Sequence, residues 1–401
     1  SRATHVSVNN ARMKKKPRGT LHVAVSKRRM STASDLHYPM YLMSFSKFER
    51  LYGPHGKTKQ LESHQVLMER GELIAWDSIC EDDDVTIICI SHEWLAWDHP
   101  DKNSIQTHTL CRALRRLKDG KVDKVNMSQY HQLAYKQNVS TSAEEWSPML
   151  KKAYIWVDWV SMPQPGAEKT EEARDALKKP GRDAVRSIPA YVERADFTII
   201  LTPHGVHENR KTQASYQSWR SRGWCVLELF ASMFSRDSKY PNLLIRSAEG
   251  TPQWIPAIDA LTCSCGNADF TCCQRNHIWT TTNEATGVTT KRSISCDKPT
   301  VHELLSILLD KKVAHLRSQK CLTLARCFAC TRQWWLRNLM DTNVAEDRAC
   351  VRPETAKDLE SFMSSLWWDT EATWHDRGSV SLLVYAAAAN NLEATKAVLE
   401  A

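Results

Sequence analysis

A group of cysteines and one histidine between residues 263 and 296 has the residue types of a metal site. It follows the pattern C-x-C-x6-C-C-x3-H, with a further cysteine nineteen residues after the histidine. Thiolate sulfurs and an imidazole nitrogen suit zinc, which takes four such ligands in a tetrahedron. Cys263 and Cys265 are too close in sequence to share an unstrained tetrahedron easily, and the same difficulty applies to the adjacent pair at 272 and 273. The best candidate ligands are Cys272, Cys273, His277 and Cys296.

This spacing is not the paired C-x-x-C form, so packed free thiols or a local disulfide remain alternatives to zinc. The count of thirteen cysteines is odd, and several lie in strand-like or helix-like segments. Both observations favour a reduced, intracellular protein over a secreted one built on disulfides.

Polar and aromatic side chains also follow two of the apolar segments. Ser91, His92 and Trp94 come after the first segment, and Asp158 follows the apolar core of the second. If both segments are parallel strands, their carboxyl ends meet at one crevice, where such sheets bind ligands. His92 has the chemistry of a general acid or base and Asp158 that of a carboxylate ligand. A hydrogen-bonded structural histidine, and an acceptor for loop amides, are the alternatives.

The segments before and after these polar residues are predicted to alternate between strands and helices. Four apolar segments predict strands: Val85–Ile90, Ala153–Val160, Phe197–Leu201 and Asn242–Ile245. Three segments with one apolar face predict helices: Ile105–Leu117, Asp183–Arg194 and Trp224–Phe234. The strands are nearly continuous apolar runs, which is typical of strands covered on both faces. We therefore expect an α/β fold with a doubly wound parallel sheet.

The composition restricts the class of protein. Apolar residues make up 42% of the 401 residues and charged residues 25%, which is ordinary for globular chains and excludes wholesale disorder. The longest apolar stretches are too short to cross a bilayer, so no membrane partner is expected. The sequence also lacks the glycine-rich dinucleotide and P-loop motifs, the H-E-x-x-H helix and the G-x-S-x-G elbow. These absences argue against dehydrogenase, P-loop ATPase and α/β-hydrolase functions.

The net charge of +8 comes from one end of the chain. Residues 1–34 contain nine Lys or Arg and no acidic residue, and the remainder carries 45 basic and 46 acidic side chains. The body is thus nearly neutral, and nucleic acid is not expected as a partner of the whole protein. The basic arm is a solvated disordered tail, a transit peptide, a nuclear signal or a nucleic-acid contact. We expect a cytoplasmic protein, with nucleus or organelle left open by this arm.

Changes in composition suggest six segments. They are a basic arm (1–34), a lead-in (35–80), the α/β domain (81–249), a Cys- and Thr-rich insertion (250–300), a helical extension (301–377) and a last segment (378–401).

Four motifs in order resemble the TIR-like domains, particularly those of the fungal heterokaryon-incompatibility type. They lie at Ile90–Leu95 (ISHEWL), Tyr154–Gln164 (YIWVDWVSMPQ), Ser187–Asp196 (SIPAYVERAD) and Ser221–Leu229 (SRGWCVLEL). The fourth is also similar to the "SRWCLDEL" helix of plant TIR domains. Together they span roughly 82–245. The sequence departs from the incompatibility pattern at Ser161, Met162 and Leu227, where the family has Cys, Ile and Gln.

The resemblance implies a TIR/flavodoxin-like fold, homotypic association in signalling and, in some members, hydrolysis of NAD at the nicotinamide–ribose bond. The catalytic Glu of those members corresponds to Glu228 here. Nicotinamide leaves as a neutral molecule, so one carboxylate that stabilises the cationic ribose is sufficient for the chemistry. The implied substrate-binding residues are Ser91, His92, Trp94, Asp158, Trp224 and Cys225. The alternative is that Glu228 only stabilises the first turn of its helix.

The last segment, Ser381–Ala401, resembles the start of an ankyrin repeat. The matching positions include Ala386, Leu392, Glu393 and Leu399, whereas Leu382 and Val384 replace the usual turn Pro and His. One such unit cannot bury its own faces, so we expect the chain to be a fragment of a longer array that binds a protein partner. The alternative is an ordinary alanine-rich helical hairpin.

Two functions follow from these patterns. One is an intracellular signalling scaffold whose TIR-like domain self-associates and whose ankyrin repeats bind a protein. The other is an NAD glycohydrolase, an NADase that uses Glu228. Neither requires a cofactor; NAD would be a substrate, and zinc is the possible bound metal.

Overall fold

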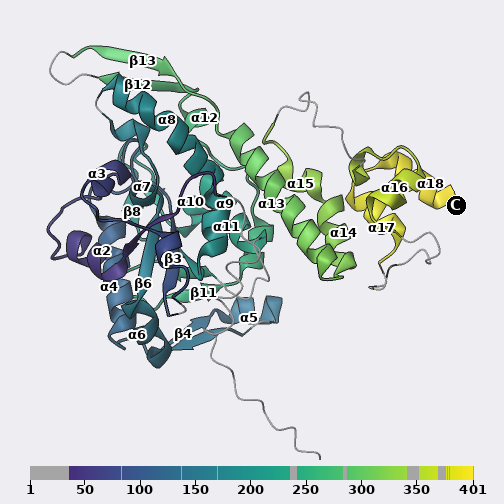
Figure 1. Ribbon diagram of the computed structural model, residues 1–401. Helices are drawn as coiled ribbons and strands as arrows, with labels where there is room; N and C mark the ends of the chain where they lie inside the picture. The colour runs from purple at the N-terminus through teal and green to yellow at the C-terminus, as the bar shows by residue number, and fades with distance from the viewer. Residues whose placement is uncertain are drawn as a thin grey trace, which may run out of the picture.

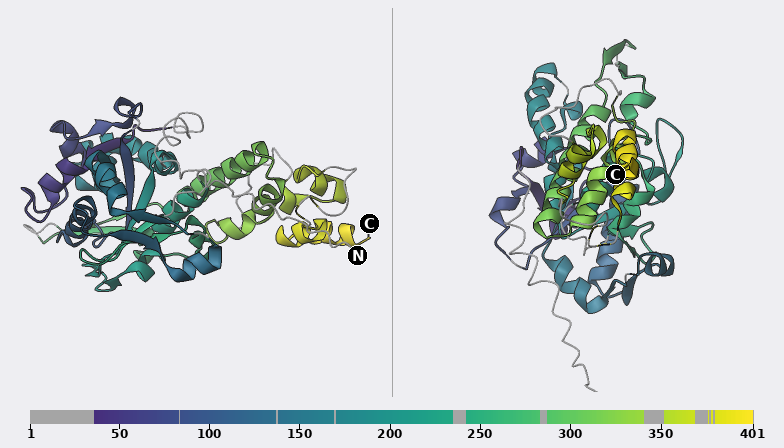
Figure 2. Two further views of the ribbon diagram at one scale, coloured as in Figure 1. Left: turned by 90° about the horizontal axis from the view of Figure 1, so that it is seen from below. Right: turned by 90° about the vertical axis from the view of Figure 1, so that its right-hand side faces the viewer.

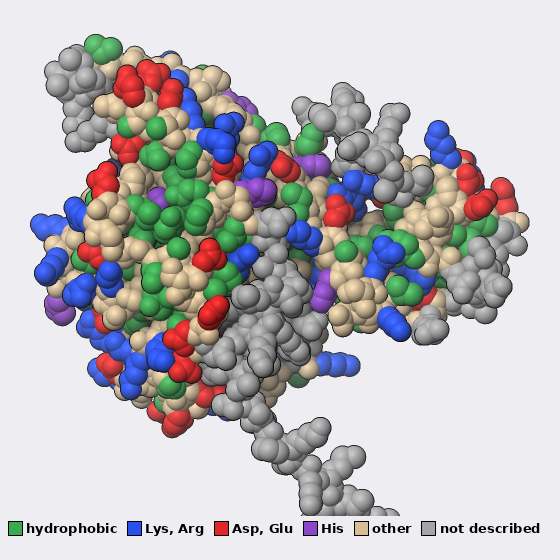
Figure 3. Space-filling view, in the orientation of Figure 1, with side chains coloured by type: hydrophobic (Ala, Val, Ile, Leu, Met, Phe, Trp, Pro, Cys, Tyr) green, Lys and Arg blue, Asp and Glu red, His purple; other side chains and the backbone are tan. Residues whose placement is uncertain are grey.

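The computed structural model describes residues 36–400 apart from 83, 137, 169, 235–241, 283–286, 341–351, 369–375, 377 and 379. Residues 1–34, expected to form a basic arm, lie outside the described residues. An α/β body holds most of the chain, and a row of helices extends from one side of it (Figures 1 and 2). Lys and Arg lie beside Asp and Glu over much of the surface in Figure 3, as the near-neutral charge of the body requires.

The α/β body is built on a nine-stranded sheet whose centre is parallel. Its order is β2-β1-β6-β3-β7-β10-β11-β4-β5. The four central strands run parallel: β6 (Ala153–Val157), β3 (Thr86–His92), β7 (Phe197–Leu201) and β10 (Asn242–Ile245). Every residue of β3 is buried, as its continuous apolar sequence predicts. The four predicted strands are therefore confirmed, and their order is that of a doubly wound fold.

The sheet is mixed, which corrects the expectation of a purely parallel one. Antiparallel pairs join β1 to β2 and β6, β11 to β10, and β4 to β5. These outer strands are β1 (Tyr41–Ser44), β2 (Ile74–Ala75), β4 (Lys124–Met127), β5 (Ser140–Ser142) and β11 (Gln253–Ile255). Each is too short to give a clear periodic signal. Residues 35–80, predicted as a lead-in, and residues 250–300, predicted as an insertion, therefore both contribute strands to the sheet.

Helices cover both faces of the sheet. Successive side chains of β3 pack on opposite faces of the sheet. Ile88 and Ile90 belong to one apolar core, and Ile87 and Cys89 belong to another. The first face is covered by α2 (Phe45–Tyr52), α4 (Ile105–Lys118) and α6 (Ala143–Lys151). The second is covered by α8 (Glu171–Arg186), α9 (Ile188–Arg194) and α11 (Gly223–Phe234).

Several boundaries differ from the sequence prediction. The strand predicted as Val85–Ile90 runs from Thr86 to His92. The second strand ends at Val157 rather than Val160, because Asp158–Ser161 forms a helical turn, α7. The helix predicted over Asp183–Arg194 is divided between the end of α8 and α9, which meet at Ser187. Helix α8 begins at Glu171, where the Thr170 side chain caps it and two glutamates occupy its first turn. Pro180 lies inside this helix, although a proline there usually indicates a loop.

Shorter elements complete the body. They are α3 (His64–Glu69), α5 (Gln129–Tyr135), β8 (Gly205–Val206), β9 (Gln213–Ala214), α10 (Tyr216–Trp219), α12 (Thr271–Gln274), β12 (Ile278–Thr282) and β13 (Thr289–Ser293). Short 3-10 turns lie at Trp76–Ser78, Pro165–Ala167, Ala257–Thr262 and Pro353–Thr355. Strands β12 and β13 form the hairpin at the edge of the molecule (Figure 1).

The described part of the chain beyond residue 297 is largely helical. Its helices are α13 (Lys298–Ser318), α14 (Leu322–Cys330), α15 (Arg332–Leu336), α16 (Leu359–Ser365), α17 (Leu382–Ala388) and α18 (Leu392–Glu400). The α17–α18 connection ends at Asn391, whose side-chain amide donates to the carbonyls of Pro353 and Ala356. None of the helices in the described part of the chain is long and apolar enough to cross a membrane.

The close approach of α11 to Phe270 depends on Gly223. A Cβ at this position would lie 2.2 Å from Cζ of the buried Phe270 ring. We expect Gly223→Ala to lower the free energy of unfolding by about 1–3 kcal/mol, because the ring must move within a packed core. Urea unfolding measures the change. Gly166→Ala is the control, since a Cβ there meets no atom within 4 Å; equal midpoints for the two variants would contradict the packing argument.

Candidate functional site

The candidate site lies where the strand order reverses. The chain forms β3 first, places β6 on one side of it and then β7 on the other. At such a point the connections leave the sheet in opposite directions, so the carboxyl ends of the strands border a crevice. Three consecutive polar residues, Ser91, His92 and Glu93, occupy the end of β3 and the position after it, and all three are buried.

Ser91 joins the sheet to α11. Its hydroxyl donates to Glu228 Oε2 at 2.5 Å and accepts a hydrogen bond from the Trp219 indole at 3.1 Å. Burial raises the pKa of Glu228 to about 8, and the Ser91 hydrogen bond opposes that rise only partly. Glu228 is the single charged residue of α11, whose other side chains are largely apolar and buried.

His92 joins the end of β3 to α7 and α4. Its Nε2 lies 3.1 Å from Asp158 Oδ1, and its Nδ1 lies 2.7 Å from Gln106 Oε1. Burial by itself lowers the pKa of His92, but the hydrogen bond and charge of Asp158 outweigh it and raise the pKa to about 9. For Asp158 burial acts in the opposite sense, yet His92 and Trp94 hold the pKa below its usual value.

Asp158 is the acceptor for this part of the site. Besides His92 it accepts from the Trp94 indole at 2.8 Å and from the backbone N–H of Trp159 at 2.6 Å. The Trp94 ring packs edge-on against Trp159, with ring centroids 5.4 Å apart. Asp158 thus accepts from the first backbone N–H after it in α7 and also forms an ion pair with His92.

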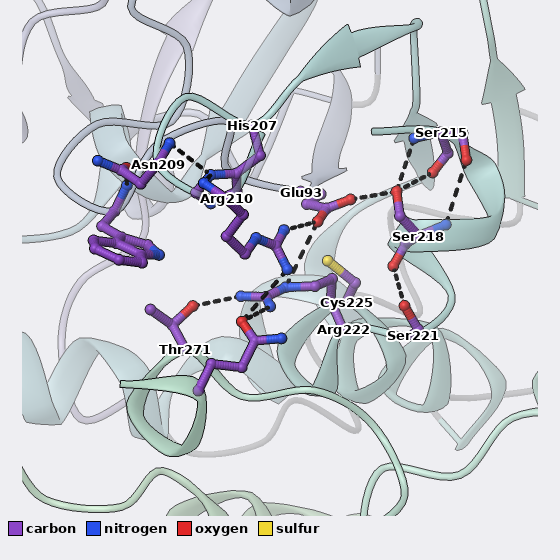
Figure 4. Close-up of polar contacts among 12 residues, drawn as sticks. Glu93, His207, Asn209, Arg210, Ser215, Ser218, Ser221, Arg222, Cys225 and Thr271 are labelled. Atoms are coloured by element: carbon purple, nitrogen blue, oxygen red, sulfur yellow. Dashed lines mark hydrogen bonds and ion pairs between the residues drawn. The ribbon is translucent and has the colours of Figure 1, made fainter. Parts of the chain in front are cut away.

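Glu93 is at the centre of a third group of ion pairs and hydrogen bonds (Figure 4). Its Oε1 lies 2.5 Å from Arg210 Nη2 and 3.9 Å from Arg222 Nε, and its Oε2 accepts from the Ser218 hydroxyl at 2.6 Å. The Glu93 side chain is only 4% exposed. Two guanidinium groups thus face the Glu93 carboxylate, and the charges of Asp269 and Asp297 also act on Arg222.

The loop between β8 and β9 positions Arg210. His207 Nδ1 accepts from the backbone N–H groups of Asn209 and Arg210, each at 3.2 Å (Figure 4). Burial, followed by the charges of Arg210 and Arg222, lowers the pKa of His207 to about 4. The imidazole is therefore neutral at pH 7, as an acceptor of two N–H groups must be.

The two remaining candidates on α11 have packing contacts. The Trp224 indole donates to Asp297 Oδ2 at 3.1 Å, and the Cys225 thiol lies 3.5 Å from the carbonyl oxygen of His92. Burial raises the pKa of Cys225 well above its ordinary value, so the thiol stays protonated at neutral pH. These contacts connect α11 to α13 and to β3, and neither gives Cys225 the character of a nucleophile.

The cysteine and histidine side chains selected from the sequence do come together. Their four ligand atoms, from Cys272, Cys273, His277 and Cys296, all lie within 4.8 Å of one another. This arrangement is able to hold a metal ion. Cys263 and Cys265, which are not among the predicted ligands, are buried in the core that surrounds α11.

Only some of the residues at this site could be predicted from the sequence. Glu93 and Arg222 lie inside two of the motifs, at 90–95 and 221–229, so the motifs could have indicated these two residues as well. Arg210 and Gln106 had no local pattern, because each reaches the end of β3 from a loop or helix that only the fold brings there.

Comparison with known proteins adds no assignment. No protein-family model, curated protein or solved structure matches this chain.

The charge pair of His92 and Asp158 makes stability depend on pH. Folded His92 has a pKa of about 9, against about 6.5 in an unfolded chain. Its pairing therefore stabilises the fold fully below about pH 6.5 and is lost as the pH rises through 9. We expect Asp158→Asn to lower the free energy of unfolding by about 1–3 kcal/mol at pH 7, and by less at pH 10.

Urea unfolding followed by tryptophan fluorescence at both pH values tests this expectation. Asp175→Asn is the control, because its ion pair with Lys178 is exposed and should contribute little. A deficit for Asp158→Asn that is the same at pH 7 and pH 10 would show that the His92 charge is not involved.

Proposed function

We propose that the α/β domain hydrolyses the nicotinamide–ribose bond of NAD, with Glu228 as the catalytic carboxylate. One observation carries the proposal. Of the three carboxyl groups around the end of β3, Asp158 pairs with His92 and Glu93 pairs with arginines. Glu228 has the Ser91 hydroxyl as its partner, and no ion pair among the described residues involves it. A cationic ligand would supply the charge that this carboxyl lacks.

The reaction requires a negatively charged group beside the ribose, which becomes positively charged. Cleavage of the bond develops positive charge on the ribose while nicotinamide leaves neutral, so no general acid is required. An ionised carboxylate in a partly buried site stabilises such a cation more strongly than one in water. A bound nicotinamide cation also lowers the pKa of Glu228, which favours the ionised form during the reaction.

The neighbouring groups suit the rest of a dinucleotide. Arg210 and Arg222 lie together beside Glu93, and guanidinium groups bind the oxygens of a diphosphate well. Trp94, which is only half-buried, lies at the same edge and places an aromatic ring next to Asp158. These contacts support a nucleotide substrate.

We expect Glu228→Gln to lower kcat/KM for NAD by about 100-fold or more, because the neutral amide cannot stabilise the ribosyl cation. For the wild-type protein, kcat/KM should rise between pH 7 and pH 9 with an apparent pKa near 8, since the free enzyme must lose the Glu228 proton. Release of nicotinamide measured by chromatography gives both quantities.

Glu172→Gln is the matched control, because Glu172 is exposed on α8 and distant in sequence from every site residue. Glu228→Gln should fold normally, since a neutral side chain suits this buried position. Wild-type protein that leaves NAD intact at high protein concentration would refute the proposal. Cleavage that survives Glu228→Gln would refute the residue assignment alone.

A second candidate, a signalling scaffold, is favoured by the exposed apolar side chains at the end of the chain. Val384, Leu392 and Leu399 are 55%, 64% and 67% exposed, and the last two lie seven residues apart on one side of α18. Large exposed apolar groups that gather on one side are typical of interaction surfaces. Under this proposal the α/β domain self-associates and the ankyrin-like pair α17–α18 binds a protein.

Light scattering distinguishes the two proposals. A scaffold predicts that the apparent mass rises with protein concentration, whether or not NAD is cleaved. A constant monomer mass over the whole concentration range, in a protein that cleaves NAD, would exclude self-association and leave the enzyme.

A further inference from the structure

The cysteine and histidine cluster brings together three separate pieces of chain. Cys272 and Cys273 belong to the short helix α12, His277 directly precedes β12, and Cys296 follows β13 just before α13. The cluster therefore lies at the base of the β12–β13 hairpin, where the chain leaves the α/β body for α13 (Figure 1).

The distances fit a tetrahedral ion. Cys273 Sγ lies 3.8 Å from Cys272 Sγ, 3.7 Å from Cys296 Sγ and 3.7 Å from His277 Nε2. With Zn–S bonds of about 2.3 Å, the sulfur atoms of a tetrahedral site lie about 3.8 Å apart. The adjacent cysteines, which posed a difficulty on sequence spacing alone, satisfy this separation because their side chains leave α12 in different directions.

The backbone around the cluster is arranged for the ligands. Asn276 and His277 have φ values of 50° and 56°, so two successive residues with side chains adopt the left-handed region. Such residues are uncommon, and they cluster where the surroundings fix a functional geometry. The backbone N–H of Asp297 also points at Cys272 Sγ, 3.3 Å away, as N–H groups do toward metal-bound thiolates.

We propose that Cys272, Cys273, His277 and Cys296 bind one zinc ion as a closed structural site. Four protein ligands complete the tetrahedron and leave no position for substrate. A disulfide between Cys273 and Cys296 would use only two of the four groups and would leave the histidine without a role.

The ion would also order the arginine part of the carboxyl-end site. Helix α12 carries Thr271 and Gln274 on either side of its two cysteines. Thr271 Oγ1 accepts from Arg222 at 2.5 Å, and Gln274 Oε1 lies 3.3 Å from Arg222 Nη1 and 3.4 Å from Arg210 Nη1. Fixing α12 therefore fixes the side chains that hold both arginines beside Glu93 (Figure 4). The zinc site itself does not depend on whether the protein cleaves NAD.

Metal analysis of protein purified without chelator tests the proposal. We expect about one zinc per chain in the wild type and in Cys321→Ser, whose cysteine is exposed and remote from the cluster. Cys296→Ser should lose most of the zinc, because three ligands hold the ion far less tightly than four. After exchange with cobalt, the wild type should show the intense visible absorption of a tetrahedral site with thiolate ligands.

Hydrogen exchange tests the structural role. Removing the ion with a chelator should speed amide exchange in α12 and the β12–β13 hairpin while leaving β3 and β7 unchanged. Well under one zinc per chain, absence of the cobalt bands, or a Cys273–Cys296 disulfide found by mass spectrometry would each overturn the proposal. The cobalt spectrum uses the wild-type protein, so it decides the question even if Cys296→Ser does not fold.

Discussion

The structure depends on the need to satisfy three consecutive polar side chains at the buried end of β3. Ser91, His92 and Glu93 are 2%, 8% and 4% exposed, and a buried polar group without a partner is costly. Each receives its partner from a different part of the chain: α11, α7 and the β8–β9 loop, respectively. The end of one strand thereby fixes how the helices and loops around it are placed.

The charges at this edge are distributed unevenly, and that unevenness gives the site its chemical character. Burial disfavours every charged carboxyl group, but His92 compensates Asp158 and the arginines compensate Glu93. Glu228 receives only a hydroxyl, so its pKa rises to about 8. A carboxyl group in an otherwise apolar helix is expensive to bury, and such a cost is often retained at functional sites. The same observation explains why we favour a cationic substrate over a purely structural role for this residue.

The cysteine cluster and the carboxyl-end site are neighbours through α12. This helix is only four residues long, and an isolated helix of that length has no stability of its own. Its position is set by what its side chains bind: Thr271 and Gln274 hold arginines, and Cys272 and Cys273 face His277 and Cys296. A short element held on both sides transmits order from one group of contacts to the other.

The four central strands, the helices after residue 297 and the cysteine–histidine group could be predicted from the order of residues alone. Long apolar runs, helical periodicity and ligand types are local properties that sequence spacing records. The antiparallel outer strands, the continuation of α8 through Pro180 and the partners of Ser91, His92 and Glu93 follow instead from the packing of the whole fold. Short edge strands bury too few residues to show a period, and Arg210 meets Glu93 from 117 positions away in the chain. Contacts of that kind are made by packing the sheet and its helices, so no local pattern specifies them.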